Sequence, residues 1–221
     1  MAKVYLSPSD QESNVYAYDN TNEAVQCGRI AEACRAALER SGVEVKVGHM
    51  ISMAQKCSES NTFGADLHVP IHTNAFNGKV MGTRMFCYSA DGKGMAACKA
   101  IFARLAPITP GESENIQVNA DYYEVRVPAA PTAYIECEFH DTVEGAKWIV
   151  ENTVLIGETI ARGICDYFGV TFKEPEQPKP AAPASGKLYR VQVGAFSVRE
   201  NADRMLARLK AAGFDGYIRE W

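Results

Sequence analysis

The sequence lacks several features that would point to common classes of protein. No apolar run approaches the roughly 18 residues of a membrane span, and residues 1–6 lead directly into a short apolar segment, with no long apolar stretch or cleavage site of a secretory signal. Lys and Arg number 23 against 27 Asp and Glu, so no basic surplus exists to neutralise phosphates. We therefore expect a protein made in the cytoplasm that binds neither nucleic acid nor a membrane.

Closely spaced cysteine pairs are missing as well. The seven cysteines are scattered and odd in number, and none forms a Cys-x-x-Cys motif. Zinc–thiolate clusters use close pairs and disulfide frameworks use even sets, so the pattern predicts reduced and mostly buried thiols. The chain also has no Gly-x-Ser-x-Gly segment, which argues against an α/β hydrolase with a nucleophile elbow, and no His-Glu-x-x-His metal motif.

A change of composition divides the chain. Residues 173–187 contain four prolines and no large apolar residue, which predicts an extended tether. Residues 1–172 are long enough for one domain with a core of its own. Residues 188–221 are too few to fold alone without a disulfide, a metal or a partner.

The first part alternates strand and helix patterns. Apolar residues at helical spacing over 22–40 end at a Ser-Gly stop, and 43–47 alternates as a half-buried strand does. Further strands are predicted over 4–6, 65–72, 83–88 and 133–137, and further helices over 52–62, 93–106 and 143–168. Pro70 weakens its strand or places it near an edge. The order predicts an α/β fold, with a mainly parallel sheet, helices on both faces, and a site at the carboxyl ends of the strands.

Three residues of this part could carry chemistry. His72 lies at the end of a predicted strand, where a metal ligand is well placed, although an isolated histidine can equally be structural. It shares a face with His68, four residues earlier, whether the segment is a helix or a strand. Glu136 interrupts an apolar strand, so it is paired, metal-bound or catalytic if buried, or exposed on an edge strand. Glu23 begins a helix, where it would also complement the positive helix terminus.

Together these residues fit a hydrolytic zinc site. A histidine and a glutamate can bind the ion, zinc lowers the pKa of its bound water to about 7, and a neighbouring carboxylate takes the proton. The spacing of Glu23, His72 and Glu136 alone does not establish such a site, because no signature of the His-Glu-x-x-His type is present.

Four segments carry a resemblance to a known family: 4–9, the helix start at 22–23, the segment 65–75 ending in His-Thr-Asn-Ala, and the strand 131–139. Through them the chain resembles the zinc-dependent N-acetylmuramoyl-L-alanine amidases of the family-3 type over residues 3–170. These enzymes cut the amide bond between muramic acid and the first L-alanine of peptidoglycan stem peptides. The resemblance implies Zn²⁺ as the cofactor, Glu23 and His72 as ligands, and Glu136 as the catalytic general base.

The first loop departs from the family pattern, which has Asp-Pro-Gly-His with the histidine as third ligand. Here residues 7–14 read Ser-Pro-Ser-Asp-Gln-Glu-Ser-Asn. Straight counting places Asp10 at the ligand position, whereas a shift by one residue places Gln11 there, and we assign Gln11. The departure leaves open a degenerate member that binds peptidoglycan without cutting it.

Other polar residues are secondary candidates. We assign substrate binding to Asn74 and to Arg126, whose guanidinium matches a stem-peptide carboxylate, with a solvated surface arginine as the alternative. His68, Glu138 and His140 are further candidates without an assigned role.

The C-terminal segment also resembles a known module. Residues 189–196 and 201–214 are similar to the first half of a sporulation-related (SPOR) repeat, a βαββαβ module that binds peptidoglycan glycan strands. The pattern predicts a βαβ half-module, with Gly213 ending its helix. Because half a module leaves sheet edges uncovered, we expect two chains to pair as a homodimer; a truncated or disordered repeat is the alternative.

The sequence therefore predicts a cell-wall amidase with a tethered wall-binding segment. Such a protein would be made in the cytoplasm and act at the bacterial cell wall after release, either as a phage endolysin or as a mother-cell autolysin. The rival interpretation is an amidase-fold protein that only binds peptidoglycan.

Overall fold

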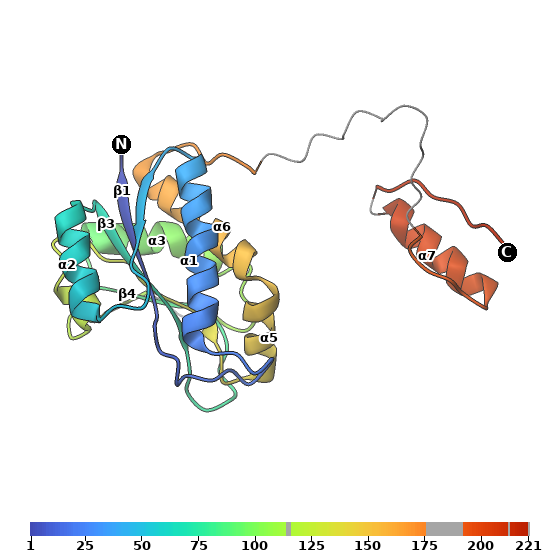
Figure 1. Cartoon of the computed structure of the whole chain (residues 1–221), viewed down its shortest axis with the longest axis horizontal. Helices are drawn as coiled ribbons and strands as arrows, with labels where there is room; N and C mark the ends of the chain where they lie inside the picture. The colour runs from blue at the N-terminus through green and yellow to red at the C-terminus, as the bar shows by residue number, and fades with distance from the viewer. Residues whose placement is uncertain (114–115, 176–191, 212, 221) are drawn as a thin grey trace. The chain divides into compact units, whose positions relative to one another are not determined.

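The computed structural model describes residues 1–113, 116–175, 192–211 and 213–220, and it divides the chain into two units, Met1–Pro175 and Glu176–Trp221 (Figure 1). The first unit holds a six-stranded sheet of order β2-β1-β3-β6-β4-β5. Strands β1, β2, β3 and β6 run parallel, β4 is antiparallel to β6, and β5 is parallel to β4. The predicted mainly parallel sheet is confirmed. The strands are β1 (Lys3–Pro8), β2 (Glu44–Val47), β3 (Leu67–Asn74), β4 (Arg84–Cys87), β5 (Ile116–Val118) and β6 (Tyr134–Phe139).

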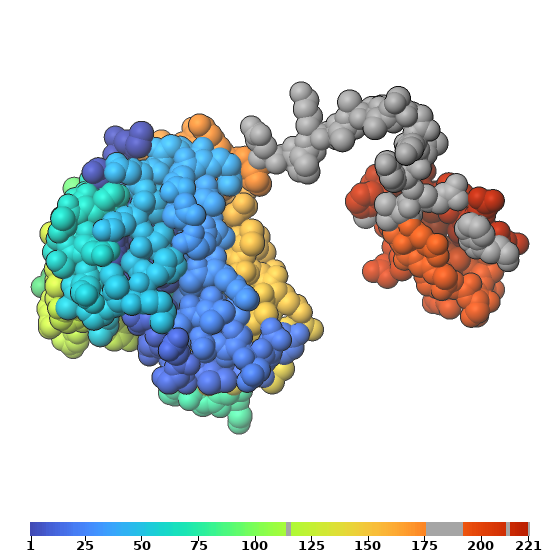
Figure 2. Space-filling model, in the orientation of Figure 1, coloured from blue at the N-terminus to red at the C-terminus, as the bar shows by residue number. Residues whose placement is uncertain are grey.

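Helices cover both faces of this sheet, as predicted. Helices α1 (Glu23–Arg40) and α3 (Lys93–Leu105) both pack against α6 (Thr153–Phe168), and the three helices cover one face. Helix α2 (Met53–Phe63) and the short α4 (Tyr123–Arg126) contact each other over the other face. Figure 1 shows α1 and α6 on one side of the strands and α2 on the other. In Figure 2 the segment coloured blue, from the loop after β1 into α1, forms the lower part of the surface seen.

The two faces of the sheet differ in polarity because side chains alternate along a strand. Val4 and Leu6 of β1, and Val69 and Ile71 of β3, belong to the main apolar core with α1, α3 and α6. The alternate residues of these strands, such as His68 of β3, point to the opposite face, where His68 lies against Cys57 of α2 and Glu124 of α4. That second face carries buried polar and charged side chains, and the chemistry of the unit lies there.

Pro70 lies in a central strand, so its predicted effect on the strand was wrong. β3 is flanked by β1 and β6, and Pro70 pairs with Ser7 of β1. On the β6 side the amide of His68 donates to Pro131, and pairing then resumes only at Ile71. The amides of β3 that face β6 belong to alternate residues, so the next one after His68 would be that of residue 70. Proline has no amide hydrogen, and its presence there therefore costs the sheet one backbone hydrogen bond.

One long helix was predicted over 143–168, and the structure shows two. α5 (Val143–Glu151) and α6 are separated at Asn152, whose side-chain amide donates to the carbonyl of Trp148 at 2.8 Å. Asparagine competes with the helix for backbone hydrogen bonds, which explains the interruption. β5 and α4 were not predicted, because three or four residues are too few to show a period.

The second unit contains α7 (Arg199–Ala211). Gly213 has a φ of +82° and its amide donates to Lys210, while the amide of Phe214 donates to Leu209. This pair of bonds ends the helix as a Schellman motif, as predicted for Gly213. The strand expected after it does not form in residues 214–220, and the strand expected before α7 does not form in residues 192–196, while residues 189–191 lie outside the described part of the chain. Among the described residues of this unit, no strand is present that could pair with either segment. Most of the predicted linker, residues 176–187, also lies outside them.

Two predictions about composition can be compared with the structure. All seven cysteines are buried free thiols, which confirms the prediction. Among the helices in the described part of the chain, none has both the length and the apolar character needed to cross a bilayer.

Candidate active site

Three elements bring Glu23, His72 and Glu136 together. Asn22 caps α1 by accepting from the amide of Val25, which places Glu23 in the first turn. His72 lies near the carboxyl end of β3, and the parallel register pairs it directly with Glu136 of β6. His72 Nδ1 lies 2.9 Å from Glu23 Oε1. The convergence at one edge of the sheet follows from parallel neighbouring strands and from a helix that begins beside them.

The carboxylate of Glu23 is held as an anion. It is 1 % exposed, and Asn14 Nδ2 donates to its Oε2 at 2.6 Å while the amide of Thr73 donates to Oε1 at 3.4 Å. Burial alone would raise the pKa of Glu23, but the hydrogen bonds from His72, Asn14 and Ser9 outweigh it and hold the pKa below its ordinary value. A buried, oriented carboxylate of this kind is suited to binding a cation.

The first loop places Gln11, rather than Asp10, next to this pair. Gln11 Nε2 lies 3.4 Å from His72 Nδ1, and Gln11 Oε1 accepts from Asn14 Nδ2 at 3.1 Å. The carboxylate of Asp10 instead lies 3.4 Å from Lys56 Nζ, and the same Nζ donates to the carbonyl of Pro8 at 2.7 Å. Lys56 of α2 is 1 % exposed, so it fixes the loop in this arrangement.

Glu136 has the environment expected of a general base. Its Oε2 is buried without a hydrogen-bond partner among the described residues. Burial raises the pKa of Glu136 to about 7; His72 opposes the rise and the negative charge of Glu23 adds to it. A carboxylate with a pKa near neutrality can take a proton and later release it. Burial alone would lower the pKa of His72, but the hydrogen bond to Glu23 and the negative charges of Glu136 and Glu23 outweigh it and hold the pKa above its ordinary value.

The residues present fit a divalent cation. Glu23 and Glu136 place two carboxylates beside one imidazole, and Glu136 Oε2 is an orphaned buried acceptor. Burying two carboxylates is costly unless positive charge balances them. Glu23 and His72 offer the oxygen and nitrogen donors that zinc accepts in catalytic sites, where three protein ligands leave one position open, and Gln11 adds an amide oxygen as a weaker donor.

Aromatic rings form one wall of this site. The ring of Tyr134 stacks on His72 with centroids 4.8 Å apart, and Tyr122 and Phe86 pack on Tyr134 at 5.2 and 6.0 Å. Our sequence analysis did not single out these rings, nor Asn14 and Lys56. Tyr134 precedes Glu136 by two residues and so shares its strand face, a pattern that could have identified it. The others are brought in by long-range packing.

Three other predicted residues have structural contacts at the same end of the sheet. The side chain of Asn74 accepts from the amide of Ala75 at 2.8 Å. Glu138 Oε1 accepts from the amides of Gly82 and Phe139 at 2.8 and 2.7 Å. His140 Nδ1 lies 2.9 Å from Thr73 Oγ1, and its ring stacks on a tyrosine. These contacts hold the loops around the site, and the substrate-binding role of Asn74 stays a prediction.

Two predicted residues lie away from the Glu23–His72–Glu136 cluster. Arg126, exposed at the end of α4, lines a surface pocket together with Tyr88 and Lys93. His68 lies under α2 and α4, where its Nε2 is 3.2 Å from Glu124 Oε1. A stem-peptide role for Arg126 stays a prediction, and His68 belongs to a different group of side chains.

Comparison with known proteins identifies relatives of both parts of the chain. Residues 177–220 match the model of the SPOR domain. The sporulation-specific N-acetylmuramoyl-L-alanine amidase of Bacillus subtilis (strain 168) is 25% identical over 225 residues, covering 99% of this chain and 84% of that protein. N-acetylmuramoyl-L-alanine amidase CwlM of Bacillus licheniformis is also 25% identical, over 99% of this chain and 85% of its own length.

Solved structures share the fold of the first unit. The catalytic domain of the amidase CwlV from Bacillus (Paenibacillus) polymyxa var. colistinus has a TM-score of 0.70 at 16% identity, covering 77% of this chain and all of that one. The amidase AmiC2 of Nostoc punctiforme has a TM-score of 0.67 at 18% identity, covering 76% of this chain and 97% of that one. Residues 9–166 match the family model described as N-acetylmuramoyl-L-alanine amidase (Amidase_3), and the chain therefore belongs to this family of peptidoglycan amidases.

Proposed function

We propose that this amidase is zinc-dependent, with Glu23, His72 and Gln11 as the ligands and Glu136 as the general base. The observation that carries the proposal is the orphaned Oε2 of Glu136 directly across the strand pair from His72, whose Nδ1 contacts Glu23. Peptidoglycan is the substrate of the family, and the bond cut is the amide between N-acetylmuramic acid and L-alanine.

In the proposed mechanism, one residue of the chain, Glu136, carries the proton from the attacking water to the leaving group. Zinc, when bound, lowers the pKa of water and polarises the scissile carbonyl. Glu136 takes the proton of the attacking water and passes it to the amine of the departing L-alanine. Glu23 stays ionised because of its hydrogen bonds, and Asn14 fixes both Glu23 and Gln11. The stacked ring of Tyr134 fixes the plane of His72.

Metal removal and product analysis test this proposal. Chelation should abolish the release of muramyl peptides from purified cell walls, and zinc added back should restore it. Mass spectrometry of the soluble products should show stem peptides with a new amino-terminal L-alanine. Full activity of chelated, zinc-free protein would contradict the zinc dependence. Products cleaved at another bond would contradict the reaction.

We also propose that the C-terminal segment binds glycan strands as a pair of chains. α7 places Ala202, Met205, Leu206 and Leu209 on one side, and all four are only partly buried. Exposed apolar residues surround it in the described part of the second unit: Val193, Phe196, Val198, Phe214 and Tyr217. A helix with such a face gains stability by burying it, and a second copy of the half-module offers a matching surface.

Light scattering on the full chain tests the pairing. We expect a dimer at high micromolar concentration, because each chain then buries the apolar face of its α7 against the other chain. Leu206→Asp places a charge on that face and should yield monomers. Ala207→Asp, on the exposed side of the same helix, is the matched control and should leave the dimer intact. A monomeric wild-type protein at that concentration would contradict the pairing.

A further inference from the structure

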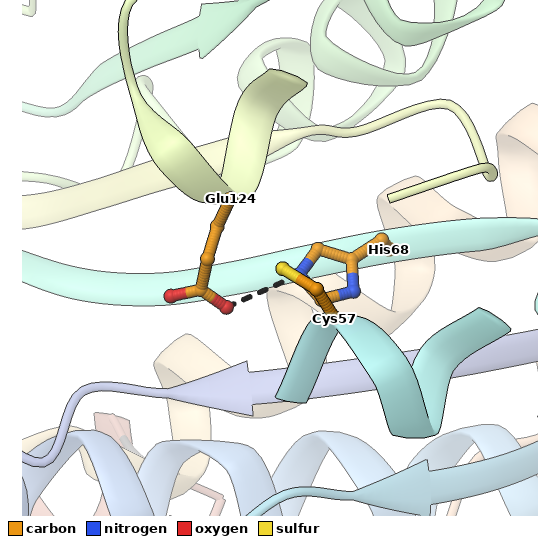
Figure 3. Close-up of side chains that lie close together, drawn as sticks. All are labelled: Cys57, His68 and Glu124. Atoms are coloured by element: carbon orange, nitrogen blue, oxygen red, sulfur yellow. Dashed lines mark hydrogen bonds and ion pairs between the residues drawn. The ribbon is translucent and has the colours of Figure 1, made fainter. Parts of the chain in front are cut away.

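Outside the proposed catalytic centre, a second group of potential metal ligands lies buried under α2 and α4. Cys57 of α2, His68 of β3 and Glu124 of α4 converge from three elements far apart in sequence (Figure 3). We propose that these three side chains bind a second zinc ion, which ties α2 and α4 to the sheet. Our sequence analysis found no close cysteine pair, and the spacing of 57, 68 and 124 gives no indication of such a site.

The geometry of the three ligand atoms is close to what zinc requires. One ligand atom from each residue lies within 4.8 Å of the other two. His68 Nε2 and Glu124 Oε1 are 3.2 Å apart. Two ligands of a tetrahedral zinc ion with bonds of about 2.0–2.1 Å are separated by about 3.3 Å. The histidine–carboxylate pair therefore has ligand spacing, and a ligand atom of Cys57 lies within 4.8 Å of both partners.

Burial and charge favour a cation here. Cys57, His68 and Glu124 are 1 %, 0 % and 3 % exposed. A thiolate, a carboxylate and a neutral imidazole carry two negative charges in total, which Zn²⁺ neutralises, so the complex can be buried without net charge. The ammonium group of Lys56 lies nearby, but its Nζ is bonded to the carbonyl of Pro8 and paired with Asp10.

Unpaired polar groups around the three residues are a second, independent observation. Among the described residues, His68 Nδ1, Ser60 Oγ and Thr132 Oγ1 are buried without a hydrogen-bond partner. Ser60 lies nearly one turn after Cys57 on α2, and Thr132 is paired with His68 across the strands. Buried polar atoms are rarely left unpaired. The Ser60 and Thr132 hydroxyls are free to bond a water in the ion's remaining position, whereas Nδ1 lies on the far side of the His68 ring from the proposed ligand atom Nε2.

The second site is separate from the proposed catalytic centre and yet connected to it. His68 and His72 lie four residues apart on β3, or about 13 Å along the strand. Glu124 is in α4, which follows Tyr122, and the Tyr122 ring packs on Tyr134 beside His72. An ion at the second site therefore fixes the element that supports the aromatic wall of the first, which gives it a structural role.

Metal content and a cobalt spectrum of the full-length protein test the proposal. The wild type should bind two zinc ions per chain and Cys57→Ala one. Cys34→Ala is the matched control, because Cys34 is equally buried but packs in the apolar core, and it should bind two. Loading with Co²⁺ should produce a thiolate-to-cobalt charge-transfer band in the wild type, in Cys34→Ala and in His72→Ala, and no such band in Cys57→Ala.

The spectrum of the wild type decides the matter even if Cys57→Ala fails to fold. Cobalt-loaded wild type without a thiolate band would overturn the proposal and leave a hydrogen-bonded His68–Glu124 pair. Equal metal content in the wild type and in a folded Cys57→Ala variant would also overturn the proposal. Neither result bears on the catalytic zinc, because that ion is followed separately through His72→Ala and through activity.

Discussion

Replacing Glu136 with glutamine is expected to lower the release of muramyl peptides by about 10²- to 10⁴-fold, the range that a general acid–base group contributes. Glutamine keeps the size of the side chain and can still lie beside His72, but it cannot take the proton of the attacking water. Glu136 is not among the proposed ligands, so zinc content should stay at the wild-type level. Initial rates on purified cell walls, with zinc measured on the same samples, check both expectations.

Glu138→Gln is the matched control for this substitution. Glu138 lies two residues further along the same strand face, and burial likewise raises its pKa to about 7. Its carboxylate accepts hydrogen bonds from the amides of Gly82 and Phe139, and a glutamine oxygen can accept the same bonds. We expect nearly wild-type turnover from Glu138→Gln. Turnover by Glu136→Gln at the level of this control would refute the assignment of the base.

The proximity of the proposed site residues could be predicted from the sequence because they lie on neighbouring strands and on an adjacent helix. Glu23, His72 and Glu136 could be placed together because parallel strands end at one edge and a helix begins beside that edge. The periods of 2 and 3.6 residues also identified most strands and helices. These are local patterns, and each of the three residues lies on an element long enough to show one.

Contacts between distant segments could not be predicted in this way. Lys56 pairs with Asp10 and so leaves Gln11 facing His72, a choice that straight counting along the loop did not make. Tyr122 reaches the site through α4, a helix of four residues with no detectable period. The antiparallel direction of β4 also depends on the loop before it and on its pairing with β6, rather than on a pattern within the strand.

Replacing His72 with alanine is expected to remove the catalytic zinc and, with it, the amidase activity. His72 supplies the only imidazole in the proposed set, and its Nδ1 contacts both Glu23 and Gln11. Losing it leaves one carboxylate and one amide, a pair that binds zinc weakly. Zinc content after gel filtration and initial rates on cell walls measure the two losses together. His72→Ala with wild-type zinc affinity and turnover would show that the ion lies elsewhere.

Three further substitutions should produce a graded effect that locates the third ligand. Asn14→Ala removes hydrogen bonds to Glu23 and Gln11, and such supporting contacts change metal affinity by about 10- to 100-fold. Gln11→Ala should weaken zinc at least as much, because it removes a ligand. Asp10→Asn should leave zinc affinity unchanged, since the Asp10 carboxylate faces Lys56. Competition with a chelator measures the zinc affinity of each variant. If Asp10→Asn weakened zinc binding and Gln11→Ala did not, Asp10 would be the ligand, and the loop would have to rearrange around the bound ion.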